Sequence, residues 1–192
     1  MNNVTKMQDV CDATVTRGTG SGEAMGLQGV YHAICHDAQG NLKWEDNAHN
    51  MLMTLGKNLN LNNTFNNTAM GASFMGLKGV GSPVVSDTMT SIANWTLAGG
   101  NITANRATIT AAMAAAALSV SPASAITTAS PIVFSITSAG PTTIAGCYVN
   151  IGGTNGNTNT TGTLFSAGDF TGGTKSVTAG DTISVTYTLT ST

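Results

Sequence analysis

Side chains that could bind a metal or act as nucleophiles gather in one short stretch, at His32, Cys35 and His36. In a β-strand His32 and His36 point to the same side but stand about 13 Å apart. Zinc ligands each lie about 2 Å from the ion, so one ion cannot join the two imidazoles. Cys35 points to the opposite side and is predicted to be a small buried hydrophobic residue. We therefore expect no metal site and no cofactor.

Nucleophilic catalysis requires a serine or cysteine beside a general base. The three histidines all lie in the first third of the chain, and no G-x-S-x-G turn occurs. Asp169 and Asp181 each follow a glycine, where turn hydrogen bonding explains them. Glu45 and Asp46 are predicted to end a strand and lead toward a helix. We expect no catalytic residue, no enzymatic activity and no small-molecule substrate.

The composition points to a protein that works inside an assembly. Charged residues make up 8% of the 192 residues, against a usual share of about 25%. A net charge of −2 offers no basic field for nucleic acid or acidic lipid, so neither partner is indicated. Low surface charge favours association, and we expect a homo-oligomer, either a dimer or a trimer.

The cysteines and the apolar runs indicate in which cellular compartment the protein is made and whether it spans a membrane. Cys11, Cys35 and Cys147 are odd in number and widely spaced, and Met1 opens into a polar segment without an apolar signal region. We expect a reduced protein made in the cytosol. The longest nearly uninterrupted apolar run, Ala111 to Val120, is about half of the ~20 residues that cross a bilayer, so no membrane span is expected.

The final strand is the clearest structural signal. Apolar side chains on one side alternate with hydroxyls on the other, the period of two of a half-buried β-strand. The predicted inward set is Ile183, Val185, Tyr187 and Leu189, and the outward set is Thr182, Ser184, Thr186 and Thr188. A slip of one residue would bury hydroxyls, so the alternation specifies its register. The expected partner strand is Pro131 to Thr137.

Further strands are predicted along the chain. Val30–His36 and Leu42–Glu45 form a hairpin around Asp37–Asn41, in which Gly40 and Asn41 supply left-handed positions. The other predicted strands are Ser73–Lys78, Ile144–Ile151, Leu164–Phe165 and Ser176–Thr178, with a turn at Ala179–Asp181. Six to eight short strands joined by Gly, Asn and Pro turns predict an all-β fold, an antiparallel, jelly-roll-like β-sandwich over residues 26–192.

One or two short helices should decorate this sandwich. Leucines at positions 52, 55 and 59 have helical spacing, with Asn47 or Asn50 as the cap. Gly56 weakens this helix by about 1 kcal/mol, so it must rely on docking. A second helical segment, capped by Ser86 or Asp87, carries Met89, Ile92 and Trp95. The alanine run from Ala111 to Ala117 is predicted to be a strand of small residues, with a short helix as the alternative.

Residues 1–25 show neither helical nor strand periodicity and are predicted to form an extended arm. Some 20 residues fully extended reach roughly 65 Å, enough to lie across a neighbouring subunit. A disordered tail is the alternative. Gly18, Gly20 and Gly22 are candidate contact residues of this arm and do not complete a phosphate-binding G-x-G-x-x-G.

Several short motifs follow one another along the chain in a characteristic order. Gly40-Asn41-Leu42-Lys43-Trp44 precedes His49-Asn50-Met51-Leu52-Met53-Thr54-Leu55-Gly56-Lys57-Asn58-Leu59. Met75-Gly76-Leu77, Asp87-Thr88-Met89, Trp95-Thr96, Arg106, Gly162-Thr163-Leu164 and Ser176 to Thr182 follow. This order resembles small virion proteins of tailed bacteriophages of the capsid decoration, or cement, type. The resemblance covers most of residues 29–190 and does not include the arm.

The resemblance implies a jelly-roll-like protein that clamps major capsid subunits together on the outer surface of the virion, after assembly in the host bacterial cytoplasm. Ser184, Thr186, Thr188 and Trp95 are then candidate interface residues, together with the arm glycines. A neck, collar or tail-fibre component is the first alternative. A carbohydrate-binding sandwich using Trp44 or Trp95 is the second, although the apolar neighbours of both tryptophans favour a core role.

Overall fold

The computed structural model describes residues 27–91, 96–97, 100–101, 118–120, 125–128, 130–137, 142–153 and 160–191. Fourteen strands and one helix are present in these ranges, and every strand pairing is antiparallel. The predicted all-β, antiparallel class is therefore confirmed, with more strands than the six to eight expected. Within the described part of the chain, no helix is both long enough and apolar enough to span a membrane.

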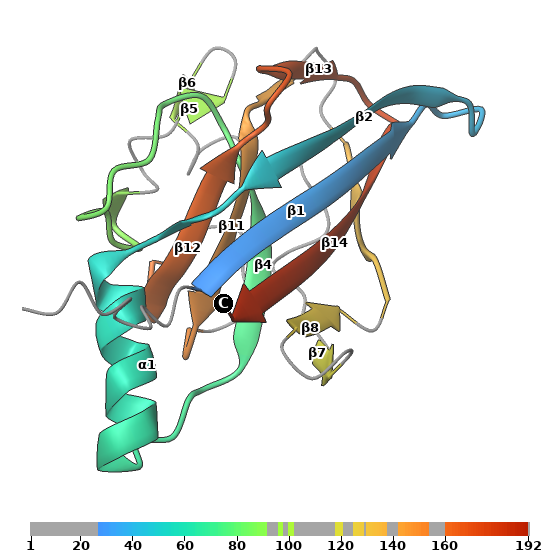
Figure 1. Cartoon of the computed structure of the whole chain (residues 1–192). Coiled ribbons are helices and arrows are strands. Elements are labelled where there is room, and N and C mark those ends of the chain that lie inside the picture. Colours follow the sequence, from blue (N-terminus) through green and yellow to red (C-terminus); the bar gives the residue numbers. More distant parts are fainter. Residues whose placement is uncertain are drawn as a thin grey trace, which may run out of the picture.

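The larger sheet has six strands in the order β2-β1-β14-β8-β7, and β9 also pairs with β14 (Figure 1). Its strands are β1 (Leu27–His36), β2 (Leu42–His49), β7 (Leu118–Val120), β8 (Ala125–Thr128), β9 (Ile132–Ser135) and β14 (Thr182–Ser191). The final strand lies in its middle, because β1 pairs along its whole length on one edge and β8 and β9 share the other. The predicted partner of the final strand is thus confirmed in β9.

The second sheet has four strands in the order β3-β12-β11-β4. These are β3 (Met51–Leu52), β4 (Ser73–Lys78), β11 (Gly146–Ile151) and β12 (Thr163–Asp169). Two small pairs complete the fold, β10 (Thr142–Ile144) with β13 (Lys175–Val177) and β5 (Thr96–Leu97) with β6 (Gly100–Asn101). The predicted strand Ile144–Ile151 is divided by Ala145, whose N–H donates to the carbonyl of Lys78 instead of extending one strand.

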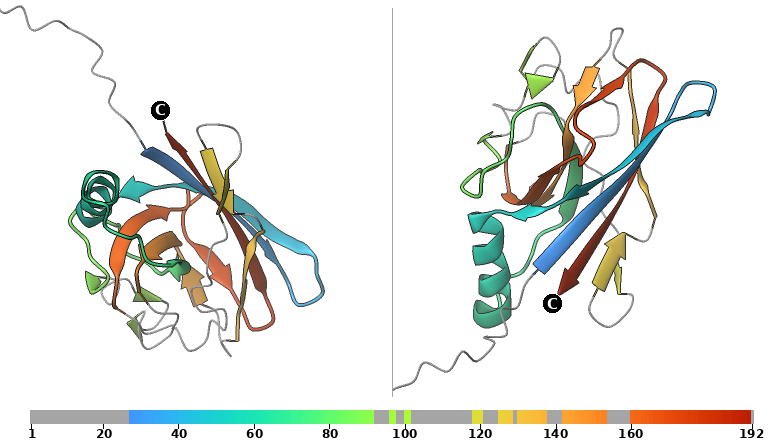
Figure 2. Two further views of the ribbon diagram at one scale, coloured as in Figure 1. Left: turned by 90° about the horizontal axis from the view of Figure 1, so that it is seen from below. Right: turned by 45° about the horizontal axis from the view of Figure 1, so that its top comes forward.

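The core lies between the two large sheets, which face one another in Figure 2. The predicted inward residues Ile183, Val185 and Tyr187 are buried, and Leu189 packs partly buried against the core. Tyr187 stacks on Tyr31 of β1 with ring centroids 4.5 Å apart. The Tyr31 hydroxyl also shares a 2.7 Å hydrogen bond with Ser166 Oγ of β12, so a polar contact joins the sheets within the apolar core.

The centre of the four-stranded sheet is buried on both faces. Every residue of β11 is buried, whereas β1 and β14 alternate. Val149 pairs with Ser166 and therefore lies on the face toward the larger sheet, while its neighbour Tyr148 lies on the other. There Tyr148 covers Gly76 of β4, where an added Cβ would stand 2.3 Å from the phenol ring.

The helix α1 (Thr54–Asn66) confirms the predicted helix at Leu55 and Leu59, but Leu52 lies in β3 and the predicted cap is wrong. The N-cap is Met53, with no side-chain cap hydrogen bond. Asn50 instead accepts a hydrogen bond from Gly29 N–H at 2.6 Å and donates one to the Tyr187 hydroxyl at 2.9 Å, and Asn47 lies inside β2. Gly56 is the docking point, because a Cβ there would stand 2.4 Å from the Phe165 carbonyl oxygen of β12.

Two other local predictions are corrected. In the β1–β2 turn Gly40 has a positive φ of 86°, but Asn41 does not. Asp37 Oδ1 accepts the Asn41 N–H at 2.8 Å within this turn. Glu45 and Asp46 do not end a strand, because β2 continues to His49. Asp46 points inward and pairs with Lys175 at 2.6 Å.

No α-helix is formed in the described part of the second predicted helix, residues 86–91. Residues 86–90 are irregular or form turns, and residue 91 is 3₁₀-helical; Asp87 Oδ2 accepts the Val84 N–H and Ser91 Oγ accepts the Thr88 N–H. Met89 of this segment is nevertheless buried. Ile92, Trp95, the run Ala111–Ala117 and the arm of residues 1–25 lie outside the described residues.

Candidate functional site

The predicted interface residues of the final strand lie together on the side of the larger sheet that faces away from the core. Ser184 stands opposite Ile34 and Val133, Thr186 opposite His32, and Thr188 opposite Val30 and Thr127. We name this surface the outward face. It comprises Val30, His32, Ile34 and His36 of β1; Glu45, Asn47 and His49 of β2; Thr127 of β8; Val133 and Ser135 of β9; and Thr182, Ser184, Thr186 and Thr188 of β14.

The outward face carries little charge. Glu45 is its one acidic residue, and its carboxylate contacts His32 Nε2 at 2.7 Å. No lysine or arginine belongs to the face as defined. At its edge, Lys43 is held by Asp181 at 2.6 Å, and Asp181 also accepts the Thr178 N–H, as the predicted turn role requires. The face therefore presents uncharged groups over most of its extent.

Hydroxyl and apolar side chains alternate across the outward face. The hydroxyls of Thr127 and Thr188 are 3.0 Å apart and hydrogen-bond to each other across β8 and β14. Val133 is 50% exposed, and Leu42, at the end of β2 beside the face, is 59% exposed. Ser184, Thr186 and Thr188 are half-buried by their neighbours. Such a surface can be covered by a partner without desolvating charges.

The other candidate interface residues are not brought together with this face, because Trp95, Gly18, Gly20 and Gly22 lie outside the described residues. Trp44 is described. Its ring packs on Phe170 with centroids 5.5 Å apart and belongs to the margin of the core, as predicted. A sugar platform built on Trp44 would require that ring to be exposed.

The two histidines and the cysteine that were first considered as metal ligands or nucleophiles lie on opposite sides of β1, as their spacing predicts. His32 and His36 lie on the outward face, and Cys35 is fully buried on the other side of β1. Burial raises the pKa of Cys35 to about 11, and burial also raises the pKa of Cys147, so both thiols stay protonated. In the described ranges, no three His, Cys, Asp or Glu side chains stand close enough to share a metal ion.

The structure adds one site that the sequence did not reveal. Lys78, at the end of β4, is fully buried, and its Nζ lies 2.5 Å from Oδ1 of Asp169, at the end of β12. Asp169 therefore does not have the turn role predicted for it. The two residues are 91 positions apart, and a lysine closing an apolar strand is an ordinary strand end in sequence, so no local signal could have paired them.

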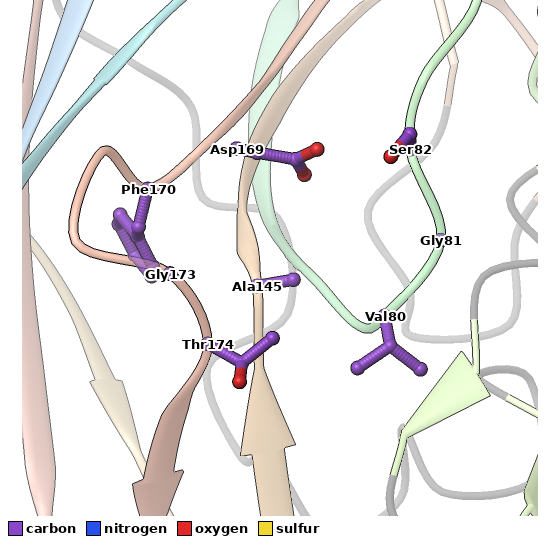
Figure 3. Close-up of a pocket in the computed structure, with 8 residues that line it drawn as sticks. All are labelled: Val80, Gly81, Ser82, Ala145, Asp169, Phe170, Gly173 and Thr174. Carbon is purple, nitrogen blue, oxygen red and sulfur yellow. The ribbon is translucent and has the colours of Figure 1, made fainter.

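A pocket of about 180 Å³ opens beside this ion pair, and Asp169 lines it with Ser82, Ala145 and Phe170. Figure 3 shows the Asp169 carboxylate reaching across the pocket toward the loop that carries Ser82. The pocket is small, and its one charged lining residue already contacts Lys78. It is better suited to a water molecule than to a metabolite.

Comparisons of the chain with protein-family models, with curated proteins and with solved structures found no match.

Proposed function

We propose that this chain is a structural protein of a bacteriophage particle, a capsid decoration protein that binds the outer surface of the shell through its outward face and bridges major capsid subunits. The motif order that resembles cement proteins supports this proposal, and so does the antiparallel β architecture. The jelly-roll-like topology of those proteins forms part of the proposal.

The observation that carries the proposal is the outward face itself. The outward face joins Thr and Ser hydroxyls with the partly exposed Val133, and its one carboxylate is already paired. A surface of this composition is suited to being covered by a partner. Many modest interfaces of this type, about 800 Å² on each partner, add up across a shell through avidity. A few strong anchors are not needed.

The test places a charge on the outward face. Ser184→Glu and Thr186→Glu should leave the isolated chain folded, because both side chains point away from the core, and should abolish its incorporation into particles. Ser176→Glu is the matched control, because Ser176 is exposed on β13, away from the face. Incorporation of the two face variants at the level of the control would contradict the proposal.

Copy number and particle stability test the location. Hundreds of copies per particle by quantitative gel are expected for a shell protein, whereas a few to a dozen would place the chain in the neck or tail. Particles stripped of the protein should lose resistance to heat and osmotic shock. Unchanged resistance would remove the cement role.

A further inference from the structure

Lys78 and Asp169 meet across three neighbouring strands. In the register of the four-stranded sheet Lys78 stands opposite Gly146, and Gly146 stands opposite Asp169. The middle position has no side chain, and an added Cβ there would lie against the backbone of Gly168. The lysine can therefore span β11 and place Nζ 2.5 Å from the Asp169 carboxylate.

Burial of the Lys78 side chain disfavours the charged ammonium. The Lys78 side chain has no exposed surface, and its Nζ also donates to the Gly79 carbonyl at 3.1 Å. Burial lowers the pKa of Lys78, and the contact with Asp169 opposes this effect. Transfer of one proton along the short Nζ–Oδ1 contact converts the ion pair into a neutral amine beside a neutral carboxylic acid. No other base is required for this step.

We propose that Lys78 and Asp169 condense into an intramolecular isopeptide bond that staples β4 to β12. The neutral Nζ attacks Cγ of the protonated Asp169 carboxyl, forming the N–C bond. The resulting tetrahedral carbon expels one carboxyl oxygen, which leaves as water with the proton that it received from Lys78 and one further amine proton. The product is an amide, nothing is oxidised or reduced, and water is the only leaving molecule.

Positioning and an exit for water complete the site. A nucleophile held in contact with its target needs no collision, which is the main advantage of intramolecular reactions. The Asp169 side chain is 41% exposed and lines the pocket of Figure 3, so the water can leave through this pocket. This proposal does not depend on a role in a virion.

The first test is the intact mass of the denatured full-length chain. We expect a mass lower than the sequence mass by one water molecule. Asp169→Ala and Lys78→Arg should each restore the full mass calculated for that variant, since neither can form the amide. A wild-type chain at its full sequence mass would overturn the proposal, and this result does not depend on whether the variants fold.

A tryptic map then locates the bond. An acylated Lys78 is not cleaved, so the peptide of residues 58–78 should be absent, and residues 58–106 should appear joined to residues 107–175. Two other ion pairs are internal controls. Lys43–Asp181 and Lys175–Asp46 have N–O distances of 2.6 Å, but their lysines are 29% and 17% exposed. Cleavage after Lys43 and Lys175 should be complete, and a water loss located at either one would contradict the assignment.

Discussion

The two large sheets use β structure in opposite ways. The six-stranded sheet buries one face and leaves the other outward, so β1 and β14 alternate between buried and half-buried residues. The four-stranded sheet is covered on both sides, and every residue of β11 is buried. We therefore expect substitutions to be tolerated at about half of the residues of β1 and β14 and at almost none of β11.

A carboxylate placed on each sheet should give the largest contrast. Val149→Asp puts a charge on β11 at a residue that is 5% exposed, and we expect a loss of at least about 4 kcal/mol in the free energy of unfolding. Thr186→Asp on the outward face should change it by less than about 1 kcal/mol. Urea unfolding of both variants measures the difference. Similar losses for the two variants would show that Thr186 is as inaccessible to water as Val149 in the isolated chain.

Gly56→Ala should destabilise the protein, although alanine is the better helix former. The new Cβ would stand 2.4 Å from the Phe165 carbonyl oxygen and push α1 away from β12. We expect a net loss of about 2 kcal/mol. The exposed Asn58 is the control, because Asn58→Ala should gain about 0.5 kcal/mol from helix propensity alone. A gain at both positions would mean that α1 does not rely on close docking.

Ser166→Ala tests the polar contact between the sheets. It leaves the buried Tyr31 hydroxyl without its partner at 2.7 Å, and we expect a loss of about 1.5 kcal/mol. The matched control is Thr127→Ala, which removes the 3.0 Å hydroxyl pair with Thr188 on the outward face, where water can replace it. Thermal unfolding should show a loss below about 0.5 kcal/mol for the control. Equal losses of unfolding free energy in the two variants would show that an unpaired hydroxyl between the sheets costs no more than one on the outward face.

The smallest expected effect concerns Asp46, which β2 points inward. Burial acts to raise the pKa of Asp46. The Lys175 ammonium and the N–H groups of Asn47 and Gly172 act to lower it, and together they outweigh burial, so the pKa of Asp46 is lowered. A lowered pKa in the folded state stabilises the protein above the unfolded pKa, and this stability is lost as pH falls through the folded value.

Asp46→Asn should therefore weaken the fall in unfolding free energy on acidification below about pH 4, the usual aspartate pKa. The measurement is the urea midpoint of wild type and variant from neutral to acidic pH. Parallel curves for the two proteins would show that the Asp46–Lys175 pair is not formed in solution.

Prediction from sequence succeeded where one face of a strand meets water. In β14 the alternation of Ile183, Val185 and Tyr187 with hydroxyls specified the strand and its inward side. The segment expected beside it is β9, but the pairing with β1 along the whole strand was not predicted. Prediction was less successful in the covered sheet, where Ile144–Ile151 looked continuous and the break at Ala145 depends on hydrogen bonds to Lys78 and Phe170. A strand buried on both faces has no polar period from which its ends can be read.

The candidate face was predicted only in part. Ser184, Thr186 and Thr188 follow from the period of two, but their neighbours on β1, β8 and β9 come from pairings between segments far apart in the chain. Asn50 shows the same limit. Its side chain was predicted to cap a helix, yet it bridges Gly29 and Tyr187, because a tertiary hydrogen bond replaced the local one.

The sequence alone determined the all-β class, the inward and outward sides of β1 and β14, the presence of a helix through Leu55 and Leu59 and the scarcity of charge, because each depends on composition or on the period of neighbouring residues. Only the tertiary structure decided that Gly56 is a docking point, that β11 is covered on both faces and that Lys78 meets Asp169. These are contacts between residues distant in the chain, and the positions of such partners are specified by packing and strand register rather than by local pattern.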